Sequence, residues 1–236
     1  MPDFSLILSC EHASNHIPKE YISLFKHREQ VLTTHRALDI GAQNTFKRLA
    51  SKFECNSIAA KNSRLLIDLN RSLHHQSVFS EFSKKLSKSD RQKLIDGVYL
   101  PYRKTIEKWI KHSKKNIHIS IHSFTPSLNG EVRNNDIGLL YDPKRPLELI
   151  FSKAWKSSIK IANPTLKTRM NHPYRGTSDG LTAALRKIKK PSEYIGIELE
   201  INQKHFFSDG RPKAAIIIDI IHSLKSTLEA FNSWNV

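Results

Sequence analysis

The segment Asn116-Ile117-His118-Ile119-Ser120-Ile121-His122 alternates apolar and polar side chains at every step. A period of two is typical of a β-strand. A helical pattern over 94–115 precedes it, in which Pro101 predicts either a kink or a break between two helices. Ser123-Phe124-Thr125-Pro126 follows and interrupts the alternation. We therefore predict a strand that ends at His122.

Strand-like and helix-like patterns alternate on both sides of this segment. Further strands are predicted over 4–10, 56–60, 136–141 and 194–201, and helices over 38–53, 146–161, 181–188 and 212–231. Such alternation is typical of an α/β fold with a largely parallel sheet covered on both faces. Two stretches lack a pattern: 72–89 is expected to be a polar surface excursion and 163–180 a loop. No Gly-rich phosphate loop is present, which argues against Rossmann and P-loop enzymes.

Composition limits the class of protein. The chain has 236 residues, 39% of them apolar, which is enough for a core, and no linker divides it, so we expect a single domain over 1–236. With 8 Gly and 2 Cys it is neither collagen-like nor a disulfide scaffold. Cys10 and Cys55 have no neighbouring Cys and are predicted to be buried free thiols. No apolar run reaches the roughly 20 residues of a membrane helix, and no signal peptide is recognised, so a cytoplasmic protein is expected.

The net charge of +16 comes from 38 Lys and Arg against 22 Asp and Glu. It raises the possibility of nucleic-acid binding, because basic side chains release counterions from phosphates. The basic residues are scattered, however, with only short clusters at 84–85, 114–115 and 186–190. We expect solvated basic surfaces that attract a small anionic substrate, and we consider nucleic acid unlikely as a partner.

Polar side chains occur where the predicted strands end. His12 follows the first strand, Arg64 and then Asn70-Arg71 the second, His122 closes the third, and Glu198 lies late in the last. The carboxyl ends of parallel strands meet at one edge of a sheet, so these groups are expected to converge. Two histidines and a carboxylate form a hydrolytic zinc site, a further carboxylate takes a proton from water, and an arginine binds a carboxylate in bidentate fashion.

Each of these residues also has a structural interpretation. A histidine is more often a surface or capping residue than a metal ligand. Glu198 and Glu200 alternate in their strand and would both face solvent if that strand were at an edge. Asn70-Arg71 would also fit a simple turn after an apolar run.

An ordered set of motifs resembles the N-formylglutamate amidohydrolase family. The motifs span about residues 5 to 203: Ser9-Cys10-Glu11-His12-Ala13-Ser14-Asn15, His35 with Asp39-Ile40-Gly41-Ala42, Ser63-Arg64-Leu65-Leu66-Ile67-Asp68-Leu69-Asn70-Arg71, Ile121-His122-Ser123-Phe124-Thr125-Pro126, Arg133 with Ile137-Gly138-Leu139-Leu140-Tyr141-Asp142, Asn171 with Pro173-Tyr174, and Ile197-Glu198. Each motif is weak alone, but the order makes the set specific.

The resemblance implies a zinc hydrolase with a fold similar to the zinc carboxypeptidases: a three-layer α/β sandwich with a mostly parallel mixed sheet. It implies that His12 and His122 bind one zinc ion per chain and that Glu198 is the catalytic base. Asn70 and Arg71 would bind a substrate carboxylate. Substrate contacts are also expected of Arg64, Arg133 and Tyr174.

The third metal ligand departs from the carboxypeptidase pattern. That pattern places a glutamate three residues after the first histidine, where this chain has Asn15. Asp39 is our choice of ligand, with Glu11 and Asn15 as alternatives, although Asp39 would also fit the start of a helix. Manganese or cobalt would suit similar ligands.

The expected reaction is therefore hydrolysis of an N-acyl amino acid such as N-formyl-L-glutamate to formate and the amino acid. The alternative is a non-catalytic basic α/β module that binds nucleic acid or an acidic partner. The oligomeric state cannot be inferred from the sequence.

Overall fold

The computed structural model describes residues 4–213 and 215–233, and its centre is a six-stranded sheet. The strand order is β2-β1-β3-β8-β6-β7. Strands β2, β1, β3 and β8 run parallel, whereas β6 is antiparallel to β8 and parallel to β7. Their bounds are β1 Ser5–Cys10, β2 Asn56–Ala59, β3 Asn116–Phe124, β6 Ile137–Leu140, β7 Thr168–Met170 and β8 Tyr194–Asn202, with a separate small hairpin of β4 Ser127–Leu128 and β5 Glu131–Val132.

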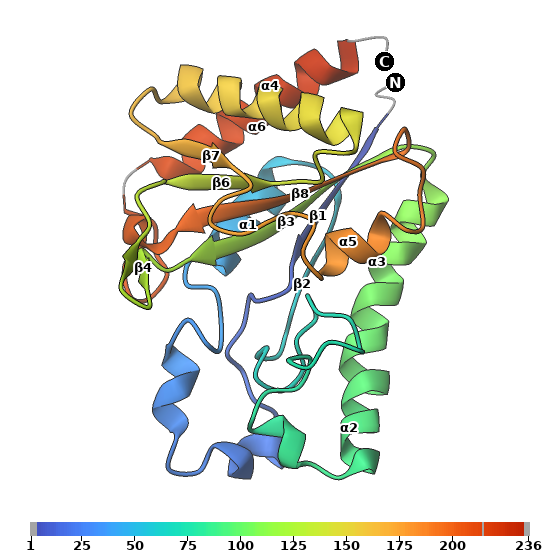
Figure 1. Cartoon of the computed structure of the whole chain (residues 1–236), viewed down its shortest axis with the longest axis vertical. Coiled ribbons are helices and arrows are strands. Elements are labelled where there is room, and N and C mark those ends of the chain that lie inside the picture. Colours follow the sequence, from blue (N-terminus) through green and yellow to red (C-terminus); the bar gives the residue numbers. More distant parts are fainter. Residues whose placement is uncertain (1–3, 214, 234–236) are drawn as a thin grey trace.

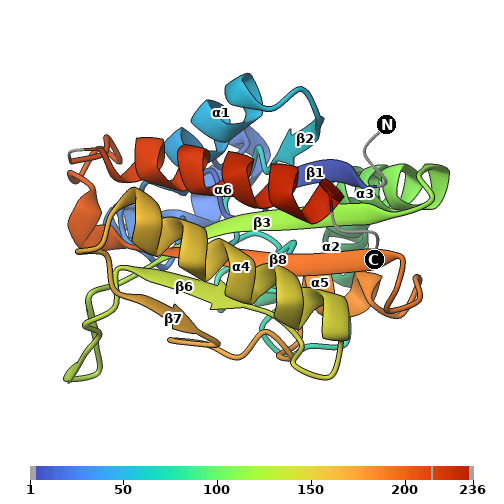
Figure 2. The ribbon, with the colours of Figure 1, turned by 90° about the horizontal axis from the view of Figure 1, so that it is seen from above.

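Helices cover both faces of the sheet (Figures 1 and 2). Helices α1 Ala42–Lys52, α4 Pro146–Ala162 and α6 Ile216–Ser233 share one apolar core on one face. On the other face α3 Leu100–His112 and α5 Leu181–Leu185 pack into a second core together with the connecting segments. The predicted fold class, a three-layer α/β sandwich with a mostly parallel mixed sheet, is confirmed.

Short helical segments complete the connections. The 3-10 helices are Lys19–Phe25, Glu29–Thr33, Ser83–Lys85 and Gln203–His205. Helix α2 Lys88–Leu94 continues through a π-helical turn, Ile95–Tyr99, into α3. Pro101 is the second residue of α3, directly after this turn, and its missing N–H interrupts the helical hydrogen bonding at this point. The predicted helix thus begins earlier than position 94, and the π-helical turn, rather than a break, precedes the proline.

The two central strands are buried along their whole length. Every residue of β3 and β8 is buried, although β3 alternates polar and apolar side chains. Its polar side chains find partners inside the protein: His118, for example, lies 2.8 Å from both the Ser9 hydroxyl and the Tyr194 hydroxyl. The alternation in the sequence therefore marks a buried polar layer and not a solvent-exposed face.

Several other predicted boundaries were wrong. Helix α1 starts at Ala42 instead of 38, and α6 starts at Ile216 instead of 212. The predicted loop 163–180 contains the edge strand β7, which is too short to show a pattern. The predicted surface excursion 72–89 contributes Val78 and Phe82 to the second core, and Phe82 stacks on Phe25.

Within the described residues, no helix combines the length and apolarity needed to cross a membrane. Both cysteines are free, Cys10 being buried and Cys55 half-buried.

Candidate metal centre and substrate pocket

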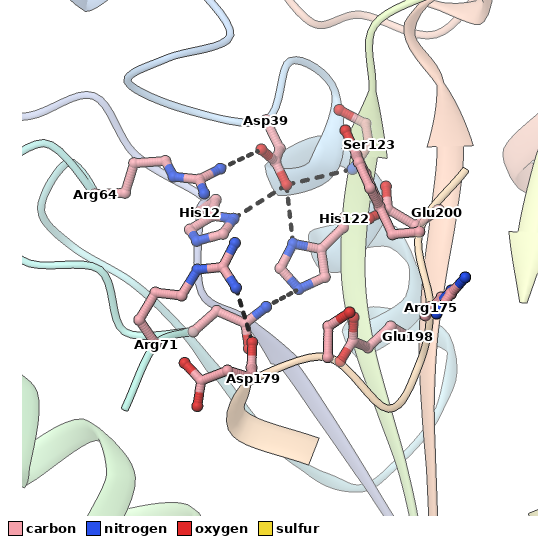
Figure 3. A pocket seen from close by; sticks show the side chains of 13 residues that line it. His12, Asp39, Arg64, Arg71, His122, Ser123, Arg175, Asp179, Glu198 and Glu200 are labelled. Atoms are coloured by element: carbon pink, nitrogen blue, oxygen red, sulfur yellow. Dashed lines mark hydrogen bonds and ion pairs between the residues drawn. The ribbon is translucent and has the colours of Figure 1, made fainter. Parts of the chain in front are cut away.

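Three buried side chains meet beyond the carboxyl ends of β1 and β3. His12, Asp39 and His122 each offer one ligand atom, and these atoms lie within 4.8 Å of one another. Oδ2 of Asp39 lies 3.3 Å from Nδ1 of His12 and 2.9 Å from Nδ1 of His122 (Figure 3). The set contains two imidazole nitrogens and one carboxylate oxygen, which is the chemistry of a catalytic zinc site with an open fourth position.

Each imidazole contacts a second carboxylate through its other nitrogen. Nε2 of His12 lies 2.8 Å from Oδ1 of Asp68, and Nε2 of His122 lies 3.1 Å from Oε2 of Glu11. With a metal ion bound, a proton on each Nε2 would satisfy these contacts and leave the Nδ1 lone pairs for the ion. This arrangement of carboxylate, histidine and metal orients ligands in known zinc proteins.

Glu11 and Asp68 are themselves held in place. Glu11 is fully buried and accepts hydrogen bonds from the hydroxyls of Ser120 and Tyr102. Asp68 accepts a hydrogen bond from the Asn70 amide at 2.9 Å and pairs with the Arg64 guanidinium at 3.0 Å. Both carboxylates are therefore part of a rigid frame behind the histidines.

The cluster is electrostatically coupled. Burial opposes ionisation of Asp39, but His12 and His122 hold the pKa of this carboxyl well below its usual range. Burial also opposes the charged form of His122, yet its hydrogen bonds with Asp39 and Glu11 raise the pKa of the imidazole well above its usual value. Without a metal ion, a proton on His122 thus balances the carboxylates. A divalent cation would take over that task.

Asp39 reaches the cluster from a loop and not from a helix. Its backbone N–H donates to the His12 carbonyl at 3.0 Å, and its carbonyl accepts from Ala42 at the start of α1. The Ser123 hydroxyl, at the end of β3, donates to the neighbouring Ile40 carbonyl at 2.7 Å. The loop is thus attached to the ends of both strands, and the interpretation of Asp39 as a helix-opening residue is wrong.

A cavity of about 250 Å³ opens beside the cluster. It is lined by His12, Asp39, Arg64, Asn70, Arg71, His122, Ser123, Tyr174, Arg175, Ser178, Asp179, Glu198 and Glu200. Of the nine predicted site residues it contains eight, the exception being Arg133.

Two glutamates of β8 line this cavity. Glu198 and Glu200 are 9% and 5% exposed, and their strand lies between β3 and β6. The alternative in which both face solvent from an edge strand is therefore wrong. Oε1 of Glu198 accepts a hydrogen bond from the Thr182 hydroxyl at 2.6 Å. Burial raises the pKa of Glu200 to about 8.

The predicted substrate-binding residues occupy different positions. Asn70 and Arg71 lie in a turn, and they also line the cavity. Arg71 donates to the Asp179 carbonyl at 2.9 Å. Arg64 is paired with Asp39 and Asp68. Arg133 reaches the cavity only through Tyr174, whose hydroxyl accepts its hydrogen bond at 3.0 Å.

The two alternative third ligands lie elsewhere. The Asn15 side chain is exposed and donates to the Leu32 carbonyl at 2.9 Å. Glu11 contacts the far nitrogen of His122, outside the three-residue cluster. Among the described residues, the candidate cluster is therefore completed by Asp39.

Sequence reasoning missed several residues of the site. Asp68 lies in the motif of residues 63–71, two residues before Asn70. No pattern in the sequence indicates its contact with His12. Glu200 was considered only as a solvent-facing residue. Arg175 and Asp179 carried no signal because they belong to the long loop. Arg175 forms no side-chain hydrogen bond or ion pair within the described part of the chain, and it lines the cavity away from the cluster (Figure 3).

The fold and this site together define a class, namely three-layer α/β proteins with a buried His-Asp-His cluster at the carboxyl ends of parallel strands. The sequence model of the N-formylglutamate amidohydrolase family matches residues 4–207, and the chain belongs to that family. Family membership makes it an amidohydrolase. The resemblance inferred from the motifs is thereby confirmed.

Solved structures agree with this assignment. The Agrobacterium tumefaciens gene product Atu2144 has 26% identity and a TM-score of 0.82, over 98% of this chain and 92% of that one. The N-formylglutamate amidohydrolase of Ralstonia eutropha JMP134 has 15% identity and a TM-score of 0.68, over 97% and 93%. At 15% identity, the similarity to the Ralstonia protein is evidence for the fold alone. No curated protein matches the sequence.

Proposed function

We propose that this protein is a zinc-dependent hydrolase that removes the acyl group, in particular formyl, from an N-acyl amino acid. The observation that supports this most directly is the buried His12-Asp39-His122 cluster beside a cavity lined by three further carboxyls and by the guanidinium groups of Arg71 and Arg175. The family to which the chain belongs supplies the reaction type.

The donor set fits zinc. Two imidazole Nδ1 atoms and one carboxylate oxygen suit a borderline-soft divalent ion, and each imidazole is oriented by a second carboxylate. A zinc ion held by His12, Asp39 and His122 would supply Lewis-acid activation of water and of the amide carbonyl.

Glu198 is proposed as the general base. Its carboxylate lines the same cavity as both histidines, and the Thr182 hydroxyl fixes one of its oxygens. Glu198 takes a proton from the attacking water as the C–O bond forms, and delivers it to the leaving nitrogen as the C–N bond breaks. The products are formate and the free amino acid.

Arg71 and Asn70 are proposed to bind the substrate carboxylate. Arg71 keeps donors free beyond its single bond to the Asp179 carbonyl. Asn70 uses its Oδ1 to accept from the Leu181 N–H at 2.7 Å, which places its amide nitrogen near His122. Arg64, Tyr174 and, behind Tyr174, Arg133 line or support the wall from which the rest of the substrate would be recognised.

Two measurements test the proposal. Purified protein supplied with zinc is expected to retain about one ion per chain by mass spectrometry, and His122→Ala should lose it. Formate release should be seen with an N-formyl amino acid, N-formyl-L-glutamate being the reference substrate, and should be lost in Glu198→Gln. Metal-free protein after zinc loading, or full activity of Glu198→Gln, would contradict the assignment.

The alternative, a non-catalytic basic module, predicts a different result. Its binding to nucleic acid or to an acidic partner would fall steeply with salt and would not change when a chelator is added. The cytoplasmic location and the single domain over 1–236 stay predictions.

A further inference from the structure

Arg186 is a buried arginine that does not line the cavity but contacts two of its walls. It directly follows α5 and is 9% exposed. Its Nη1 donates to the Gly176 carbonyl at 2.6 Å, and its Nη2 donates to the Gly196 carbonyl at 2.8 Å. Gly176 belongs to the loop between β7 and α5, whereas Gly196 belongs to β8. One guanidinium thus joins the loop to the central sheet.

The loop and β8 both carry residues of the cavity (Figure 3). Arg175 and Asp179 lie on either side of Gly176 in the loop, and both line the cavity. Glu198 lines it from β8, two residues after Gly196. Because one guanidinium holds both glycine carbonyls, it fixes the backbone of Arg175 relative to Glu198.

Glu148 of α4 holds the Arg186 guanidinium in this orientation. Its side chain is fully buried, and its two oxygens lie 2.9 and 3.2 Å from Nε of Arg186. It also accepts hydrogen bonds from the backbone N–H groups of Asp142 and Gly196 at 2.8 and 3.2 Å. Strand β6 ends opposite Glu198 and does not reach Gly196, so this ion pair takes the place of a neighbouring strand there. Several charge-assisted hydrogen bonds to one planar guanidinium fix its geometry.

We propose that Arg186 is a positioning residue that sets the affinity for the anionic substrate by holding the loop at Gly176. The Arg175 side chain has no partner in the described structure, so its direction depends on the backbone that carries it. That backbone is bound on both sides of the next peptide: the Gly176 N–H donates to Oδ1 of Asn171 at 3.0 Å, and the Gly176 carbonyl accepts from Arg186. The inference rests on the proposed function, which supplies the substrate.

The chain offers a matched control in Arg145. This arginine is also buried, and its Nε lies 3.2 Å from Oε1 of the same Glu148. Its hydrogen bonds go to the backbone carbonyls of Arg186, Lys189, Lys190 and Tyr194. Within the described residues none of them reaches the loop 171–180. A loss of packing or of a buried ion pair should therefore be similar at both arginines, whereas a change in the loop should follow only from Arg186.

The kinetic test compares Arg186→Lys with Arg145→Lys. Lysine keeps the charge but lacks the planar fork that serves two carbonyls and a carboxylate at once. Arg186→Lys should raise the KM for N-formyl-L-glutamate about tenfold, with kcat within about threefold of the wild type. It should retain its zinc, because the metal cluster lies outside the loop. Arg145→Lys should keep the wild-type KM, and an equal rise of KM in both variants overturns the proposal.

A double variant tests whether Arg186 acts through the loop residue Arg175. In an Arg175→Ala background, Arg186→Lys should raise KM much less than it does in the wild type, because the group that it positions is gone. Independent effects, in which the two increases of KM multiply, overturn the proposal.

Trypsin cleavage separates this inference from the proposed function. Trypsin cleaves after arginine, and the bond between exposed Arg175 and buried Gly176 becomes accessible when the loop opens locally. Arg186→Lys should speed cleavage at this bond about tenfold, and Arg145→Lys should not. This result would support the role of Arg186 in holding the loop even if the wild type released no formate, which would contradict the proposed function alone. Equal cleavage rates in the two variants overturn the inference.

A second variant covers the case in which Arg186→Lys does not fold. Glu148→Gln combined with Arg186→Met replaces the buried ion pair by uncharged side chains, a change that proteins often tolerate. It removes the same contact with the Gly176 carbonyl and should show the same rise of KM and the same cleavage after Arg175. A folded double variant with the wild-type KM and cleavage rate overturns the proposal.

Discussion

The carboxylate of Glu11 lies 3.1 Å from Nε2 of His122, on the side of the imidazole opposite Asp39. Glu11 precedes His12 in the chain, so one segment after β1 supplies both a candidate ligand and the partner that orients the other histidine. Asp68 does the same for His12 from the segment that carries Asn70 and Arg71. The two histidines are thus held by carboxylates from elements far apart in sequence.

Removing the Glu11 charge should weaken metal binding without unfolding the protein. Glu11→Gln keeps the shape of the side chain, but it makes the His122 imidazole less basic and holds its ring less firmly. We therefore expect about 10–100-fold weaker zinc binding. Competition with a chromogenic chelator measures this, with Glu193→Gln as the control. Unchanged affinity would show that Glu11 serves only the packing of the core.

Metal binding should release a proton and weaken as the pH falls. The raised pKa of His122 means that its imidazole is protonated in the metal-free protein near neutral pH, and zinc must displace that proton. Affinity should drop about tenfold per pH unit below that pKa. Calorimetry in buffers of different ionisation enthalpy counts the released protons, and a count near zero would contradict this description of the cluster.

The stability of the metal-free protein should reveal the burial of Glu200. In the folded protein the pKa of Glu200 is about 8, above its ordinary value of 4.5. The stability that depends on protonated Glu200 is therefore fully present below pH 4.5 and is lost as the pH rises through about 8. With chelator present, Glu200→Gln should therefore gain thermal stability relative to the wild type over this range. Parallel unfolding curves, with no pH-dependent gap, would mean that Glu200 reaches solvent.

The loop that carries Tyr174, Arg175 and Asp179 should not tolerate a side chain at position 176. A Cβ on Gly176 would lie 2.1 Å from the backbone nitrogen of Tyr141. We expect Gly176→Ala to destabilise the protein by roughly 1–3 kcal/mol or more, and to lower activity as the loop shifts. Gly97→Ala is the matched control for urea unfolding, because nothing lies within 4 Å of its added Cβ. Equal midpoints for the two variants would show that the loop is loosely seated.

Arg175 should matter for substrate affinity more than for turnover. Its guanidinium has no partner in the described structure and lines the cavity. Arg175→Ala is expected to raise KM about tenfold with a smaller change in kcat, the pattern for an interaction made equally in ground and transition states. Arg169→Ala, an exposed arginine of the nearby strand β7, should change neither value. A kcat loss with normal KM would instead assign Arg175 to the transition state.

Much of the fold could be predicted because local patterns carry it. The alternation of 116–122 and the strand-like pattern of 194–201 mark the two central strands, and amphipathic periodicity marks the helices that cover them. Edge strand β7 and the π-helical turn before Pro101 could not be predicted. The first has only three residues, and the second shares the helical pattern of the α-helices on either side of it.

The sequence by itself determined which residues stand at the ends of parallel strands, since such ends share one edge of the sheet. That is why His12 and His122 could be predicted, whereas Asn70 and Arg71 lie in a turn well beyond β2 and Glu198 lies inside β8. Tertiary structure alone decided what each of them faces. The register that sets Glu200 opposite His122, the loop that brings Asp39 between two imidazoles, and the burial that leaves Glu200 unpaired all depend on contacts between distant segments. A linear pattern holds no information about such contacts, because they form only when the sheet has assembled.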